Sequence, residues 1–206
     1  MVNTIELFCG TKSFSKVAKL KGYNTFTVDI DKKFNPDLVS DIMDLDVSKL
    51  PKNPLIVWAS PPCTEYSRAK SQGIRDIAGA NKLVLKTIEI IKELKPKYWI
   101  IENPQTGLLT KQDFMQDLKF TDASYCMYGL PYKKQTRFWN NILNLKLKTC
   151  NKLCGQMIGN RHIGSCGTGG KGQGHKIKYS NRSYDKLEKY AIPPELIKEI
   201  VALLYK

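Results

Sequence analysis

A cysteine in a stiff loop is the side chain of this sequence best suited to covalent chemistry. Cys63 ends the segment Ser60-Pro61-Pro62-Cys63, which follows an unbroken apolar run at residues 55–59. An apolar run without alternation that stops at two prolines predicts a fully buried strand. The thiol is therefore expected just beyond the carboxyl end of a strand, where open α/β sheets bind ligands, and it is a candidate nucleophile. The alternative is a small buried hydrophobic residue, because free cysteine is among the most buried residue types.

A carboxyl group is predicted at the same edge of the sheet. Residues 98–101 form a second apolar run, and Glu102, Asn103 and Pro104 follow it directly. A carboxyl group at a strand end is commonly a helix cap or a solvated charge. Two polar groups that converge from adjacent strand ends indicate a site more strongly than either does alone.

The N-terminal part of the chain predicts a βαβ unit that could hold a nucleoside. A β-type run stops at Gly10, Ser13 could cap the helix that follows, and the next strand ends in Asp29. Such a unit can place a nucleoside over its first turn and the ribose hydroxyls on the acid. Asp41, in a short third strand, could reach an adenine amino group.

The remaining sequence completes an α/β pattern and then changes in composition. Residues 81–95 have helical apolar spacing, and residues 124–128 with 138–141 predict a hairpin. From about 146 to 181 the chain is basic and glycine-rich, without the apolar periodicity of an independent core. A helix with a buried face is expected from Pro194 onward.

Length and charge limit the class of protein. The chain has 206 residues, enough for one domain with a sizeable core, and its formal net charge is +14. A globular chain this basic most often meets a polyanion such as nucleic acid; the alternative is a basic surface that serves solubility. We expect no signal peptide, no membrane partner, a cytoplasmic location and six cysteines that are free thiols, metal ligands or catalytic groups.

Taken together, these motifs resemble the cytosine-5 DNA methyltransferase family, in particular its compact phage-type orphan members. The resemblance runs over about 3–142 and resumes near 184–204. Residues 6–10 are similar to the first S-adenosylmethionine motif, residues 61–63 to the nucleophile loop, and residues 102–104 and 135–137 to the Glu-Asn-Val and paired-arginine motifs. The implied fold is a doubly wound, Rossmann-like α/β methyltransferase with a small irregular insert.

The resemblance also implies a role for each site residue. The Cys63 thiolate would add to carbon 6 of cytosine, Glu102 would hold the ring nitrogen and amino group, and Arg137 the ring carbonyl. Base flipping would bring the cytosine to them. The implied catalytic residues are Cys63, Glu102, Arg137 and Pro62. The implied S-adenosylmethionine site consists of Phe8, Gly10, Thr11, Lys12, Ser13, Asp29, Ile30, Asp41, Ile42, Ser60 and Pro61.

Double-stranded DNA is the implied partner. Polar and basic residues in the loop after Cys63 and around the paired-arginine motif could contact it, although solvation is the ordinary role of a single lysine. These residues are Ser67, Arg68, Lys70, Arg75, Lys133, Lys134 and Gln135.

Two departures from the family pattern affect these expectations. Lys12-Ser13 stands where the family carries Gly-Gly, and Gln135 replaces the first arginine of the usual pair. The Lys12 ammonium could accommodate a carboxylated S-adenosylmethionine, whereas a solvated lysine is the ordinary outcome.

The insert contains a second candidate site, for zinc. Cys150 and Cys154 have three residues between them, as do His162 and Cys166, and Cys126 lies just before the insert. A metal would supply the folding energy that a glycine-rich insert lacks, with four of these five residues as ligands. The alternative is a set of unrelated free thiols and a surface histidine.

We therefore expect a monomeric enzyme with a catalytic cofactor-binding domain at 1–142, a target-recognition insert at 143–182 and a helix at 183–206 that completes the catalytic domain. Its expected reaction is methylation of cytosine at carbon 5 in double-stranded DNA, in a bacterial or phage-infected cell. The alternatives are the same chemistry on RNA, transfer of a modified methyl group, and a catalytically silent nucleic-acid-binding protein.

Overall fold

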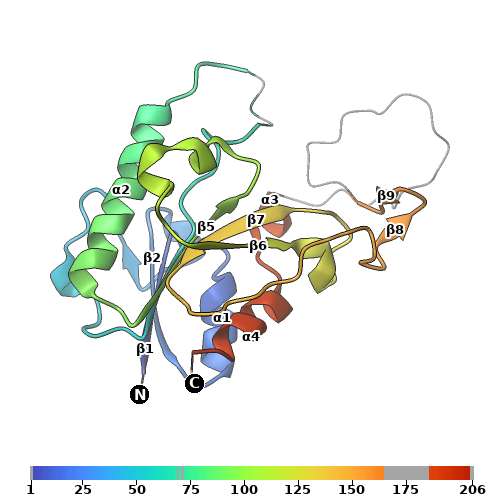
Figure 1. Ribbon diagram of the computed structural model, residues 1–206. Helices are drawn as coiled ribbons and strands as arrows, with labels where there is room; N and C mark the ends of the chain where they lie inside the picture. The colour runs from blue at the N-terminus through green and yellow to red at the C-terminus, as the bar shows by residue number, and fades with distance from the viewer. Residues whose placement is uncertain (1, 69, 71, 165–185, 205–206) are drawn as a thin grey trace.

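The computed structural model describes residues 2–68, 70, 72–164 and 186–204, and a seven-stranded sheet lies at its centre (Figure 1). The strand order is β3-β2-β1-β4-β5-β7-β6. Five strands are parallel: β1 Asn3–Leu7, β2 Asn24–Asp29, β3 Leu38–Val39, β4 Ile56–Ala59 and β5 Tyr98–Pro104. Two are antiparallel to their neighbours: β7 Gln135–Asn140, which pairs with β5, and the edge strand β6 Phe120–Ser124.

Helices cover both faces of the sheet, which confirms the predicted doubly wound α/β fold. Helices α1 (Ser13–Leu20) and α4 (Pro194–Val201) lie side by side on one face, and α2 (Ile77–Leu94) covers the other (Figure 1). Strand β4 is buried on both faces, since Ile56 and Trp58 belong to the core under α1 and α4 while Val57 and Ala59 belong to the core under α2. This two-sided burial explains its unbroken apolar sequence.

Aromatic packing centres on Trp58. Its ring stacks on Phe14 of α1 at 5.0 Å between centroids and meets Phe138 of β7 edge-on at 5.9 Å. The Ile192 N–H donates to Ser13 Oγ at 3.1 Å and ties the approach to α4 to the start of α1. The face under α1 is thus completed by residues from both ends of the described chain.

Several short elements complete the described part. The insert contains a two-stranded hairpin, β8 (Met157–Ile158) and β9 (Arg161–His162), and α3 (Lys186–Tyr190) precedes α4. Turns of 3₁₀ helix lie at Lys32–Phe34, Val47–Lys49, Leu108–Lys111, Asp113–Met115 and Tyr125–Tyr128. None of the helices in this part of the chain is long and apolar enough to cross a bilayer.

Several predicted boundaries were wrong for local reasons. The third strand ends at Val39, so Asp41 lies beyond it. Only Ser124 of the predicted strand at 124–128 belongs to β6, because residues 125–128 turn into 3₁₀ helix. Ser13 begins α1 and does not cap it, since the N-cap is Lys12 in a left-handed conformation. Helix α2 begins four residues before the predicted 81, because Asp76 accepts a hydrogen bond from the Gly79 N–H at 2.7 Å and caps it.

Replacing Ile197 with alanine should lower the free energy of unfolding by about 2–5 kcal/mol, the usual cost of truncating a fully buried isoleucine. Urea unfolding followed by circular dichroism measures this cost. Lys198→Ala, on the exposed face of the same helix, should change stability by no more than about 0.5 kcal/mol. Equal effects of the two substitutions would contradict the packing of α4 on α1.

Candidate active site

A cavity of about 340 Å³ opens at the carboxyl ends of β1, β2, β4 and β5. The chain leaves β1 and β4, which are neighbours in the sheet, toward opposite faces, and ligands of α/β sheets bind at such a point. Most residues predicted for catalysis and for the cofactor line this cavity, together with one predicted for DNA. They are Phe8, Gly10, Thr11, Ser13, Asp29, Ile30, Ser60, Pro61, Pro62, Cys63, Glu102 and Lys134.

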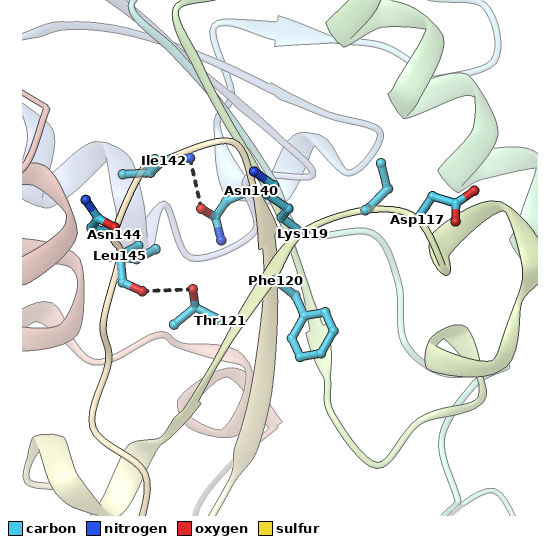
Figure 2. Close-up of a pocket in the computed structure, with 9 residues that line it drawn as sticks. Asp117, Lys119, Phe120, Thr121, Asn140, Ile142, Asn144 and Leu145 are labelled. Atoms are coloured by element: carbon cyan, nitrogen blue, oxygen red, sulfur yellow. Dashed lines mark hydrogen bonds between the residues drawn. The ribbon is translucent and has the colours of Figure 1, made fainter.

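A second cavity, of about 430 Å³, lies beside β6 and the end of β7 and contains none of the predicted residues (Figure 2). Thr121 Oγ1 donates to the carbonyl oxygen of Leu145 at 3.1 Å, and the Ile142 N–H donates to Asn140 Oδ1 at 3.0 Å. These bonds hold the segment after β7 against the sheet.

Because most of the predicted residues line the cavity of about 340 Å³, that cavity is the candidate active site.

The loop that carries Cys63 is fastened to the two strands beside it. Asn103 Nδ2, on β5, donates to the carbonyl oxygen of Pro61 at 2.9 Å. Trp58 Nε1, on β4, donates to Ser60 Oγ at 3.2 Å. The two bonds and the two prolines restrict the loop, so the half-buried thiol has a defined position at the cavity.

The electrostatic surroundings of Cys63 favour the neutral thiol. Burial is the largest effect that raises its pKa, the charge of Glu102 raises it further, and Lys134 acts in the opposite direction. Glu102 is itself buried and accepts a hydrogen bond from the Tyr125 hydroxyl at 3.2 Å. Burial raises the pKa of Tyr125 well above its usual value, so the phenol remains a neutral donor. Sequence reasoning missed Tyr125, whose only signal is an aromatic residue in a predicted strand.

Asp29 joins the turn after β1 to the end of β2. Its Oδ2 accepts a hydrogen bond from the Gly10 N–H at 2.8 Å, and its Oδ1 accepts one from the Asp31 N–H at 2.9 Å. Because a carboxylate offers about four acceptor positions, roughly two remain for ligand hydroxyls. Phe8 lies in the same turn with φ of +56°, an energetically costly conformation of the kind that clusters at functional sites.

Glu6 is a buried acid at the cavity that was not among the predicted site residues. Its carboxylate accepts hydrogen bonds from the backbone N–H groups of Phe14 at 3.2 Å and Ser15 at 2.9 Å, in the first turn of α1. Burial nevertheless raises the pKa of Glu6 to about 7. The signal that could have revealed it is an acid between two apolar residues, Ile5 and Leu7, of a strand.

Arg137 does not line the cavity. Its guanidinium forms a two-bond ion pair with Asp122, with both N–O distances 2.8 Å, and lies 3.5 Å from the centroid of the Phe120 ring. In the β5–β7 register Arg137 is opposite Asn103, and Phe138 is opposite Glu102. Alternation along paired strands therefore puts the side chains of Arg137 and Glu102 on opposite faces of the sheet.

Three predicted cofactor residues also lie outside the cavity lining. The Lys12 ammonium donates to the backbone carbonyl of Asn35. Ile42 is buried in the core under α2, and Asp41 Oδ1 accepts a hydrogen bond from the Met43 N–H at 2.9 Å. Their contribution to cofactor binding remains a prediction.

The loop after Cys63 uses two of its predicted DNA-contacting cations for its own structure. Lys70 forms an ion pair with Glu65, and Arg75 donates to the carbonyl oxygens of Glu65, Ser67 and Lys70 at 2.7–2.8 Å. Arg68 is exposed. Lys133 lies between the 3₁₀ turn and β7, and Gln135 is the first residue of β7; both are adjacent in sequence to Lys134 at the cavity.

Four of the five predicted metal ligands are brought together away from this cavity. They are Cys126, Cys150, Cys154 and His162. Each offers one ligand atom, and these four atoms all lie within 4.8 Å of one another. The fifth, Cys166, lies outside the described residues.

The sequence matches, over residues 2–122, the family described as C-5 cytosine-specific DNA methylase. A protein of Frog virus 3 (isolate Goorha), named probable DNA (cytosine-5)-methyltransferase, is 30% identical over 97% of this chain and 98% of its own length. The type II methyltransferase M.DdeI of Desulfomicrobium norvegicum is 26% identical over 67% of this chain, which spans 40% of that protein. The predicted family is confirmed by the family match and the viral relative.

A solved structure shares the fold at low sequence identity. It is described as the structure of a DNA modification methyltransferase encoded within an E. coli prophage. Its sequence is 20% identical to this chain, and the TM-score is 0.51. The similarity covers 68% of this chain and 46% of that one.

The pH dependence of Cys63 alkylation tests the electrostatics of the cavity. Reaction of Cys63 with iodoacetamide, followed by peptide mass spectrometry, should have its midpoint above that of an ordinary thiol, because burial and Glu102 raise the pKa. Glu102→Gln removes the negative charge, so the midpoint should move to lower pH. Glu89→Gln, at an exposed carboxylate on α2, is the matched control and should leave the midpoint unchanged. An unchanged or higher midpoint in Glu102→Gln would contradict this assignment.

Proposed function

The chain belongs to the family of C-5 cytosine-specific DNA methylases, and from that premise we propose that it methylates carbon 5 of cytosine in double-stranded DNA through a covalent Cys63 adduct. As a member of this family, the chain is a DNA (cytosine-5-)-methyltransferase. The observation that carries the proposal is the convergence of Cys63, Glu102 and Asp29 on one cavity. The net charge of +14 supports a polyanionic substrate.

The residues of the cavity fit S-adenosylmethionine as cofactor. Asp29 retains acceptor positions for ribose hydroxyls, and Phe8 offers an aromatic face for an adenine. Asn103 Oδ1 is buried without a hydrogen-bond partner among the described residues, so it is available to a donor in the cavity. When bound, S-adenosylmethionine supplies an electrophilic methyl group.

Cys63 would activate the cytosine by covalent addition. The thiol first loses its proton to solvent. The thiolate then forms a bond to carbon 6, and the electron pair of the carbon 5–carbon 6 double bond makes carbon 5 nucleophilic. Glu102 would hold the ring nitrogen and the amino group, and the Tyr125 hydroxyl holds Glu102 in place. After the methyl group is in place, the proton at carbon 5 passes to solvent, the double bond re-forms and the bond from sulfur to carbon 6 breaks, which releases Cys63.

The proposed chemistry requires the base to leave the DNA helix. Cys63 lies at the wall of a cavity of about 340 Å³, which stacked bases of a duplex cannot enter. The loop after Cys63 is braced by Arg75 and by the Lys70–Glu65 ion pair. We propose that this loop enters the gap left by the flipped base, with the exposed Arg68 available to the phosphates.

Lys134 is the cation that we propose for the role first predicted for Arg137. It lines the cavity, its charge acts on Cys63, and its ammonium lies 4.9 Å from the centroid of the Tyr125 ring. Arg137 is occupied by Asp122. The Lys134 ammonium would donate to the ring carbonyl of the cytosine.

Expression in cells that lack cytosine methylation tests the reaction. Mass spectrometry of digested DNA should show 5-methylcytosine with the wild-type chain and none with Cys63→Ala. In purified protein, Glu102→Gln should lower methyl transfer by roughly 10²-fold or more, as expected for loss of a group that stabilises developing charge. Glu89→Gln should retain full activity.

Other outcomes would each contradict a different part of the proposal: the methyl donor, the DNA substrate or the enzymatic activity. A cytosine adduct heavier than the methyl derivative would mean a modified methyl donor. Methylation of tRNA but not of duplex DNA at equal salt would overturn the DNA substrate, and folded wild-type protein without either activity would indicate a binding protein.

Lys134→Met should lower the turnover number for methyl transfer by about 10-fold or more, because it removes a charged donor from the cavity. It should also move the Cys63 alkylation midpoint to higher pH, since Lys134 lowers the pKa of the thiol. Lys86→Met on α2 provides the control for loss of a lysine. Full activity in Lys134→Met would remove this residue from the proposed mechanism.

A further inference from the structure

The Cys/His cluster has the dimensions of a tetrahedral metal site. The sulfur atoms of Cys150 and Cys154 each lie 3.4 Å from His162 Nε2, and all four ligand atoms, including that of Cys126, lie within 4.8 Å of one another. Zinc bonds of ~2.3 Å to sulfur and ~2.05 Å to nitrogen give a tetrahedron with edges of about 3.5–3.8 Å. The described cysteines of this cluster are free, so no disulfide accounts for the spacing.

The chain around Cys150 is folded to support a negatively charged sulfur. The Lys152 N–H donates to Cys150 Sγ at 3.3 Å, and Lys152 has φ of +75°, which turns the chain back toward Cys154. The Cys150 N–H donates to Ser124 Oγ at 3.1 Å and fixes this turn to the end of β6.

Nothing else in the described structure provides this segment with a core. From 149 to 164 no side chain belongs to either buried apolar cluster, and Leu153 is 81% exposed. Hairpin β8–β9 has two residues in each strand, and an isolated two-stranded hairpin is marginal at best in water. A metal bound by four side chains would supply the missing stabilisation.

We propose that Cys126, Cys150, Cys154 and His162 bind one structural zinc ion that fastens residues 148–164 to the turn after β6. All four positions of the tetrahedron are filled by protein ligands, as in structural zinc sites, so Cys166 is not required. Three thiolates and a neutral imidazole around Zn²⁺ leave a net charge of −1.

The site has a direct structural link to the candidate active site. Cys126 is 1% exposed and follows Tyr125, whose hydroxyl bonds to Glu102. The Gly164 N–H also donates to the carbonyl oxygen of Pro131 at 2.7 Å. The zinc ion would therefore fix the insert to the same turn that supports Glu102.

Metal analysis of the full-length chain tests the proposal. Protein without a histidine tag, prepared from zinc-supplemented cells, should contain one zinc ion per chain by plasma mass spectrometry. Cys154→Ser and His162→Ala should lose this zinc, and Cys166→Ser, the matched control for removal of a cysteine, should retain it. Folded wild-type protein without zinc, or zinc lost in Cys166→Ser and retained in Cys126→Ser, would overturn the ligand set.

Three further measurements use the wild-type chain alone, so they test the zinc site even where a variant fails to fold. Protein refolded with Co²⁺ should show the visible absorption bands of tetrahedral cobalt bound to thiolates, and zinc removal should make residues 148–164 sensitive to protease. A disulfide within the cluster, found by mass spectrometry of the metal-free native chain, would contradict the proposal. These measurements use neither DNA nor a methyl donor, so their outcome is separate from that of the proposed methyl transfer.

Discussion

The parallel pairing of β4 with β5 is the contact on which the candidate site depends. Ala59 lies opposite Ile101, so the chain segments that lead to Cys63 and Glu102 leave the sheet side by side. The side chain of Asn103 then bonds to the backbone of the Cys63 loop. Because both strands are buried on both faces, this edge cannot shift without disturbing two close-packed cores.

Features that depend on where a strand ends could be predicted from the sequence. Glu102 directly follows an apolar run, Cys63 lies four residues after the end of another, and Asp29 is the last residue of a β-type run; the carboxyl ends of parallel strands share one edge. The orientation of Arg137 could not be predicted in this way, because it depends on the register between two antiparallel strands. A register shift of one residue moves a side chain to the opposite face, and no local pattern fixes the β5–β7 register.

Features that depend on partners far away in the sequence could not be predicted either. Glu6 accepts hydrogen bonds from the first turn of α1, and the Tyr125 hydroxyl donates to Glu102, which lies 23 positions earlier in the chain. The metal cluster is an intermediate case, because cysteine and histidine spacing indicated five candidate ligands without a choice among them. The turn at Lys152 and hairpin β8–β9 then bring three of them to Cys126, and this grouping is a property of the folded chain.

The return of α4 to α1 has a consequence for how the chain is made. The core that contains Phe14, Val17 and Ala18 remains incomplete until residues 194–201, which lie beyond the insert, have been synthesised. A nascent chain therefore carries an open apolar layer on the ribosome for most of its translation, and exposed surface of this kind favours aggregation and chaperone binding. A longer insert would extend that period. It would add little to the entropic cost of folding, because the cost of closing a loop grows only slowly with loop length.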